Sequence, residues 1–220
     1  MTLNAYTHRT TLNTILLLAI LSCLFFNPAP ALALGNGTAT FPDFAEFTKT
    51  VQNSDATVLR GVYVPEVLAL PVTQQPAGNA GYVSSRVGEV TQFGMAAQFG
   101  NVGLLAHNHL SGSSFSQLVV GQEVRLVYGN GTVEYFVITQ ILQFQALEPT
   151  SLYSSFRDLT NNEILTAEQL FNMVYRGERH VTFQTCIAGT ESLSWGRLFI
   201  MAVPKTRIAS MDRFDPKLDP

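Results

Sequence analysis

The chain has 220 residues, of which 46% are hydrophobic and 13% charged, and its formal net charge is −3 at pH 7. That length suits one domain with a sizeable hydrophobic core. The mildly acidic balance and the lack of Lys/Arg clusters argue against a protein that binds nucleic acid or anionic lipid.

The first 33 residues have the pattern of a signal peptide. Arg9 precedes the apolar run Ile15–Phe26, and Ala-Leu-Ala follows at 31–33. A basic region, an apolar core and an A-x-A site are the three parts of a secretory leader. The run is shorter than the ~20 apolar residues of a spanning helix. We therefore predict cleavage after Ala33 and an extracytoplasmic protein, secreted or associated with the cell surface. An uncleaved anchor is the alternative, and a lipobox ending at Cys23 is a weaker one.

The remaining chain is predicted to contain one all-β domain over residues 57–204. A flexible lead-in over 34–56 precedes it, and a polar tail over 205–220 follows it. Short β-rich or apolar runs punctuated by turn signals lie at 57–64, 67–72, 103–107, 124–128, 132–138, 181–187 and 197–203. Many short strands with few helices indicate a barrel or a sandwich. Gly129-Asn-Gly131 predicts a hairpin between its two flanking runs, and Pro65 and Pro71 predict that the first two runs are not long central strands.

The segment from Pro149 to His180 differs from the rest, because it is long, polar and irregular. It holds one predicted helix, Ala167–Tyr175, with a capping box formed by Thr166 and Gln169 and a stop at Gly177. Long connections of this kind in a compact β domain are often functional. An ordinary surface excursion is the alternative.

Cys186 would be the only thiol left after cleavage of the leader, because the chain has two cysteines and the other is Cys23. An unpaired thiol in an oxidising compartment has no internal disulfide partner. The simplest interpretation is a buried, inert cysteine. However, strand alternation places Cys186 with Thr182 and Gln184 on the more polar face. We therefore predict that Cys186 points toward a groove or solvent, as a nucleophile requires.

Partners for a nucleophilic thiol lie elsewhere in the chain. His107 and His109 follow a predicted strand, and Arg197 opens the strand after Cys186. Alone, each is usually structural, but together the three residue types can perform acyl transfer. A thiolate attacks a carbonyl, an imidazolium protonates the leaving amine, and a guanidinium donates hydrogen bonds to the oxyanion. His180 is expected to be a surface-loop histidine. No cofactor or metal is predicted, because the histidines and the cysteine lack zinc-type spacing. Asp158, Glu163 and Glu168 are too scattered to indicate calcium.

Several segments resemble the sortases, extracytoplasmic cysteine transpeptidases that attach proteins to bacterial cell walls or to one another. Thr182–Cys186 resembles the family's Thr-Leu-x-Thr-Cys strand, with Phe183 in place of Leu, and Trp195–Ala202 resembles the arginine strand that follows it. The remaining matches are Gly103–Asn108 with Phe115, Leu118 and Gly121–Val124 for the histidine region, and Val64–Val72 for the early Ile-Pro-x-Ile strand. The order His, Cys, Arg is the family's order, and the likeness covers about residues 57–204. The chain departs from the family in having Ala106 before the histidine, where glycine is usual.

The resemblance implies a closed, mostly antiparallel eight-stranded β-barrel with a long helix-containing loop. Cys186 would be the nucleophile, His107 the general acid and base, and Arg197 the oxyanion donor. His107 is preferred over His109 because it ends the apolar strand. Substrate-binding residues would be Thr185 beside the nucleophile and Leu170 and Phe171 on the apolar helix face. The substrate would be a Leu-Pro-x-Thr-Gly-like sorting signal of an exported protein, cleaved after Thr. An amine acceptor, such as a wall precursor or a pilin lysine, would resolve the thioacyl intermediate.

Two alternatives to a transpeptidase follow from the same residues. The chain could be a cysteine hydrolase on this scaffold, with water as the acceptor. It could also be a non-catalytic secreted binding module that keeps the barrel. Nucleic acid is not an expected partner, and a membrane is expected only through an uncleaved leader.

Overall fold

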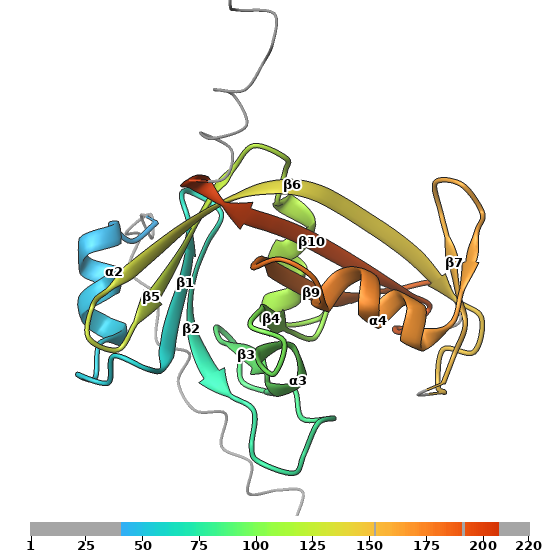
Figure 1. Cartoon of the computed structure of the whole chain (residues 1–220), viewed down its shortest axis with the longest axis horizontal. Coiled ribbons are helices and arrows are strands. Elements are labelled where there is room, and N and C mark those ends of the chain that lie inside the picture. The colour runs from blue at the N-terminus through green and yellow to red at the C-terminus, as the bar shows by residue number, and fades with distance from the viewer. Residues whose placement is uncertain (1–40, 152, 191, 207–220) are drawn as a thin grey trace, which may run out of the picture. The chain divides into compact units, whose positions relative to one another are not determined.

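A computed structural model describes residues 41–151, 153–190 and 192–206 (Figure 1). Helices α2 (Phe44–Val51), α3 (Gly94–Ala97) and α4 (Ala167–Tyr175) and the 3-10 helix η2 (Ser111–Gln117) accompany the strands. The strands are β1 (Leu59–Val64), β2 (Leu68–Gln74), β3 (Val90–Phe93), β4 (Val102–Leu105), β5 (Glu123–Tyr128), β6 (Val133–Ala146), β7 (Phe156–Asp158), β8 (Ile164–Leu165), β9 (Val181–Ile187) and β10 (Gly196–Pro204). Among the described residues, no helix is long and apolar enough to span a membrane.

The strands close into a barrel. They form one sheet in the order β10-β9-β4-β3-β2-β1-β5-β6-β7-β8, and β10 also pairs with β6. This extra pairing joins the two ends of an eight-strand ring, so the predicted closed eight-stranded barrel is confirmed. β7 and β8 lie outside the ring, as a hairpin on the end of β6. The pairs β2–β3 and β4–β9 are parallel, and every other pairing is antiparallel.

Alternate side chains of the barrel strands point inward and form the main core. On β9, Val181 and Phe183 are fully buried there, as strand alternation predicts. Phe115 of η2 packs edge-on against Phe183, at a centroid separation of 5.2 Å, and thus fixes η2 against β9. The core therefore holds the cysteine strand in place from inside the barrel.

Helix α4 has the bounds predicted from the sequence. Thr166 and Gln169 form the expected capping box, and Gly177 has a φ of 102°, which suits a helix stop. Buried apolar residues of α4 form a second cluster with outward-facing side chains of β6, β8 and β10: Phe144, Leu165, Leu170, Val174, Tyr175 and Phe199. The helix thus covers the outer face of the barrel beside β9 and β10 (Figure 1).

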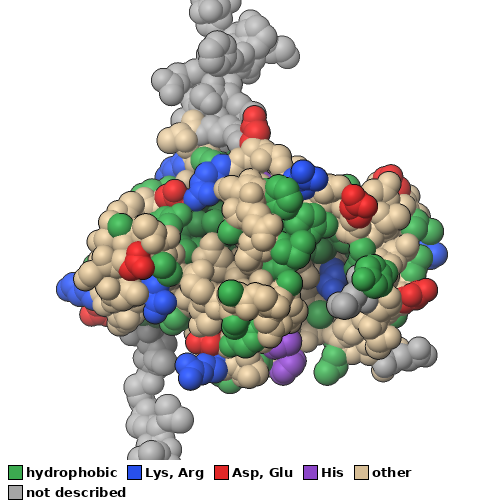
Figure 2. Space-filling view, turned by 60° about the horizontal axis from the view of Figure 1, so that its bottom comes forward, with side chains coloured by type: hydrophobic (Ala, Val, Ile, Leu, Met, Phe, Trp, Pro, Cys, Tyr) green, Lys and Arg blue, Asp and Glu red, His purple; other side chains and the backbone are tan. Residues whose placement is uncertain are grey.

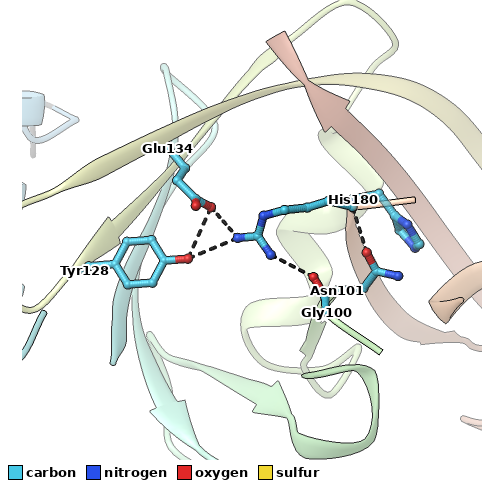
Figure 3. A network of polar contacts seen from close by, with 6 residues as sticks. Gly100, Asn101, Tyr128, Glu134 and His180 are labelled. Carbon is cyan, nitrogen blue, oxygen red and sulfur yellow. Dashed lines mark hydrogen bonds and ion pairs between the residues drawn. The ribbon is translucent and has the colours of Figure 1, made fainter. Parts of the chain in front are cut away.

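Polar side chains join the C-terminal end of α4 to the barrel. The carbonyl of Val174 accepts a hydrogen bond from Thr182 Oγ1 at 2.6 Å and contacts His180 Nε2 at 2.9 Å. The Tyr175 carbonyl accepts from Asn101 Nδ2 at 3.0 Å, and Asn101 Oδ1 accepts from the backbone N–H of His180 at 2.8 Å (Figure 3). Because the last carbonyls of a helix have no partner within it, these contacts stabilise the end of α4.

Within the predicted flexible lead-in over 34–56, residues 44–51 instead form helix α2. Phe47 and Val51 are buried against Tyr63 and Val127 of the barrel, and Asp43 caps the helix. Gly61 of β1 permits this close packing, since a Cβ there would lie 2.9 Å from the Phe47 ring and 3.0 Å from Val51. The predicted leader and residues 207–220 of the predicted tail lie outside the described residues.

A polar network fastens the end of the barrel where β9 begins. Arg179 donates from Nη1 to the Gly100 carbonyl at 2.8 Å and from Nη2 to the Tyr128 hydroxyl at 3.1 Å, and it forms an ion pair with Glu134 (Figure 3). Tyr128 ends β5 and Glu134 lies near the start of β6. The network therefore links four separate segments, at the opposite end of β9 from Cys186.

Candidate active site

Cys186 and Arg197 lie on neighbouring antiparallel strands. They are direct partners in the β9–β10 register. Directly opposed residues of an antiparallel pair have Cα atoms about 4.5–5.5 Å apart and project to the same face of the sheet. Cys186 is a free, half-buried cysteine, so it is neither a fully buried core residue nor fully exposed. The two predicted residues are thus brought together by strand pairing alone.

His107 approaches Cys186 from the other side of β9. Strand β4 pairs with β9 in parallel, with Leu105 opposite Gln184, and the Ala106 N–H donates to the Gln184 carbonyl at 3.2 Å. Continuing this register by two residues brings His107 level with Cys186. The three residues therefore come from adjacent segments in the order His107, Cys186, Arg197 across the barrel wall.

The structure distinguishes the two neighbouring histidines by their place in the chain. The His107 carbonyl accepts from the N–H groups of Leu110 and Gly112, both at 3.0 Å, so the chain turns away from β9 immediately after His107. His109 lies within that turn and is exposed, whereas His107 is half-buried. Their rings stack at a centroid separation of 5.4 Å. Histidine side chains reach the surface at the lower edge of the face in Figure 2. These observations favour His107 as the partner of Cys186.

A cavity of about 370 Å³ adjoins the cysteine. Its lining comes from η2 and the turn before it, from the end of β9, and from β6 and β10: Asn108, Gly112, Ser113, Ser116, Gln143, Thr185, Cys186, Ile187, Ala188 and Leu198. His107 and Arg197 are not among these lining residues.

Thr185 is the predicted substrate-binding residue that lines this cavity. Its side chain is 4% exposed, and its hydroxyl has no hydrogen-bond partner among the described residues. A buried hydroxyl without a partner costs free energy unless something binds it. Gly112 packs closely against this hydroxyl, at a distance that only a residue without a side chain allows. A Cβ at Gly112 would lie 2.7 Å from the His107 carbonyl oxygen, 2.9 Å from that of Ala106, and closer still to Thr185 Oγ1.

Arg197 is held by the loop between β9 and β10. Its Nη1 donates to the carbonyls of Ser194 and Gly196, at 2.9 and 2.8 Å. Within residues 41–151, 153–190 and 192–206, no hydrogen bond of Nη2 or Nε accompanies these two. In the same loop, Trp195 packs on Gly189, where a Cβ would lie 2.7 Å from the indole ring.

Leu170 does not form part of the predicted apolar surface for a peptide. Leu170 is 3% exposed and packs in the cluster beneath α4, because its position on the helix faces the barrel. Phe171 is half-buried among Phe93, Phe99 and Tyr175. The assignment of Leu170 as a substrate-binding residue is therefore wrong for this arrangement, since the barrel already occupies its apolar side chain.

His180 is buried, not a surface-loop histidine. It is 4% exposed, and its ring nitrogens contact the Glu178 and Val174 carbonyls at 2.7 and 2.9 Å. The sequence could not predict the burial of His180, because its ring contacts backbone carbonyls, which leave no mark in the residue pattern. Within the part of the chain that the structure describes, no group of three or more His, Cys, Asp or Glu side chains could hold a metal ion.

Sequence reasoning missed the polar support behind the strand of Cys186. Burial raises the pKa of Tyr175 above its ordinary range, so its hydroxyl stays protonated and donates to Gln184 Oε1, two residues before Cys186. Asn108 was also missed as a contact, although it follows His107 directly. Its Nδ2 donates to the Leu193 carbonyl at 2.8 Å. No pattern in the sequence pairs these residues, because each contact joins separate elements.

Comparison with known proteins gives structural neighbours only. No family model and no curated protein matches the chain. Similar solved structures include sortase A of Listeria monocytogenes, at 15% identity over 69% of this chain and 88% of that one, with a TM-score of 0.41. A lid mutant of Streptococcus agalactiae sortase C1 has 15% identity, 71% and 72% coverage, and a TM-score of 0.43. Sortase C-1 of Actinomyces oris has 12% identity, 74% and 81% coverage, and a TM-score of 0.45. All three are sortases, the family that the sequence motifs resemble. At these identities and TM-scores, the structural likeness alone does not establish an activity.

Proposed function

We propose that this protein is a cysteine transpeptidase of the sortase type, acting outside the cytoplasm on a sorting signal of exported proteins. The observation that supports this most strongly is the alignment of three segments. Cys186 stands opposite Arg197 in the β9–β10 register, and the β4–β9 register brings His107 level with Cys186 from the other side. These residue types are the ones that acyl transfer through a thioester needs.

In the proposed first half-reaction, the Cys186 thiolate attacks the carbonyl carbon of the scissile peptide bond. The carbonyl π electrons move to oxygen, and Arg197 donors stabilise that oxyanion. When the tetrahedral intermediate collapses, the C–N bond breaks, and the His107 imidazolium gives its proton to the leaving amine. The products are a thioester on Cys186, a neutral imidazole and a peptide with a new amino terminus.

The second half-reaction reverses these roles. An incoming amine attacks the thioester carbonyl while neutral His107 accepts its proton, and the C–S bond breaks to release the Cys186 thiolate. Thr185, whose buried hydroxyl lacks a partner beside the nucleophile, would bind a polar group of the peptide. A Leu-Pro-x-Thr-Gly-like signal is the proposed substrate, and a wall-precursor amine or a pilin lysine is the proposed acceptor.

Intact-mass spectrometry tests the proposal. The purified protein is incubated with a mixture of Leu-Pro-x-Thr-Gly-like peptides, with and without an amine acceptor, beside a Cys186→Ala variant. An acyl adduct or a transfer product that is absent from the variant supports a transpeptidase and reveals the preferred peptide. Free acid that forms even with the amine present indicates a hydrolase. No adduct and no product across a varied peptide set contradicts the proposal and favours a binding module.

A further inference from the structure

The segment that carries His107 and the loop that holds Arg197 flank Cys186 without a backbone ladder between them. On one side, the last backbone hydrogen bond to β9 is from Ala106 to Gln184. On the other side, the β9–β10 register ends at Ile187 opposite Gly196. Strand pairing therefore fixes each flank to β9 separately, and it does not fix the two flanks to each other.

One side-chain hydrogen bond crosses this gap. Asn108 Nδ2 donates to the Leu193 carbonyl at 2.8 Å, between residues 85 positions apart in the sequence. The Leu193 side chain is 65% exposed, so packing of that side chain does not anchor the loop here. Asn108 also lines the cavity beside Cys186, which places the contact next to the nucleophile.

The crossing contact leads directly to the guanidinium. Leu193 accepts from Asn108, and the next carbonyl, that of Ser194, accepts from Arg197 Nη1 at 2.9 Å. A continuous path therefore runs from His107 through the adjacent Asn108 to Leu193 and Ser194, and then to Arg197. The side-chain hydrogen bond of Asn108 goes to the Leu193 carbonyl of the loop and not to Cys186, His107 or Arg197.

We propose that Asn108 is a positioning residue that sets the placement of His107 relative to Arg197 around Cys186. This inference rests on the proposed function, because it assigns those residues their roles. A net hydrogen bond corresponds to roughly a 3- to 10-fold effect on a rate, and small displacements of catalytic groups are costly. Loss of the contact is therefore expected to slow formation of the thioester by about that factor, with KM unchanged.

The rate of alkylation of Cys186 by iodoacetamide, followed from about pH 5 to pH 9, tests this without any peptide substrate. Variants Asn108→Ala, Asn108→Gln and His107→Ala are compared with the wild type. Two control variants are Leu193→Ala, which keeps the accepting carbonyl, and Asn172→Ala, which removes an asparagine whose side chain accepts from Arg176 on α4. Melting temperatures are measured for all of them.

The expected result is that His107→Ala slows alkylation near neutral pH and that Asn108→Ala moves the pH profile toward that of His107→Ala. Asn108→Gln, which retains the amide donor, should restore part of the rate, and both control variants should match the wild type. A lower melting temperature with an unmoved profile would mean that Asn108 is only structural, which overturns the inference.

The two proposals fail in distinguishable ways. If His107→Ala alkylates as fast as the wild type, His107 does not assist the Cys186 thiol. The proposed function then lacks its general acid and base, and the inference about Asn108 is refuted with it. If His107→Ala is slow while Asn108→Ala is as fast as the wild type, the positioning role is refuted and the proposed function stands.

Discussion

Replacement of Gly112 by alanine tests the close packing around the turn that follows His107. An added Cβ would lie 2.7 Å and 2.9 Å from the carbonyl oxygens of His107 and Ala106, and closer still to Thr185 Oγ1. Two of these three atoms belong to the backbone, so the turn itself must shift. Overpacking of this kind typically costs about 1–3 kcal/mol. For a domain of this size that corresponds to a melting temperature lower by roughly 2–12 °C.

Differential scanning fluorimetry measures the melting temperature of Gly112→Ala. The alkylation rate of Cys186 measures whether the shifted turn alters the site. The matched control is Gly81→Ala, because its nearest neighbour would lie 3.9 Å away and its backbone is not left-handed. That control should be stabilised by about 0.4–1 kcal/mol, through a less flexible unfolded chain. If Gly112→Ala melts at or above the wild-type temperature and alkylates at the wild-type rate, the close approach of Gly112 to Thr185 does not constrain the site.

Three further predictions concern single contacts. Arg197→Lys should slow thioacyl formation by about 10²–10³-fold, because it removes the planar fork of donors; rates near the wild type would exclude an oxyanion role. Tyr175→Phe should cost about 1 kcal/mol in urea denaturation through loss of the hydrogen bond to Gln184, and an unchanged midpoint would contradict this. Lys205→Ala should cost about 0.2–1 kcal/mol at pH 7, because the Lys205 hydrogen bond lowers the pKa of Glu123. A carboxyl with a depressed pKa contributes stability above its unfolded pKa and loses it as the pH falls through the folded value. The difference between Lys205→Ala and the wild type should therefore shrink as the pH falls below the ordinary pKa of a glutamate, and a constant difference would refute the coupling.

The sequence predicted best those features that depend on neighbours along the chain. Cys186 and Arg197 lie on consecutive strands joined by a short loop, so their pairing follows from alternation and connection length. Helix α4 was predicted to the residue, because its caps are local signals. The position of His107 could not be predicted from neighbours along the chain, since a parallel β4–β9 pairing joins segments far apart in sequence. Residue type and the end of an apolar strand made His107 a candidate, and the likeness of the motifs to a known family assigned its role.

The features that were missed depend on distant partners or on very short elements. Strand β3 has four residues and β8 has two, too few for periodicity to be visible. Phe44, Phe47 and Val51 of helix α2 have helical spacing, but nothing local in the sequence indicates that Gly61 leaves room for the helix on the barrel. The apolar face of α4 is present, but the barrel covers its residues Leu170 and Val174. A hydrophobic stripe does not specify what covers it.

The parallel pairing of β4 with β9 also has a consequence for the order in which this protein becomes reactive. Contacts between segments distant in sequence form slowly, because closing the intervening loop costs entropy before the contact contributes any stabilisation. The β4–β9 pairing, which brings the segment of His107 alongside that of Cys186, is such a contact. Under the proposed function, a newly made or partly folded chain would therefore carry an unassisted thiol until the barrel closes. Folding itself would then be the step that brings the imidazole to the thiol.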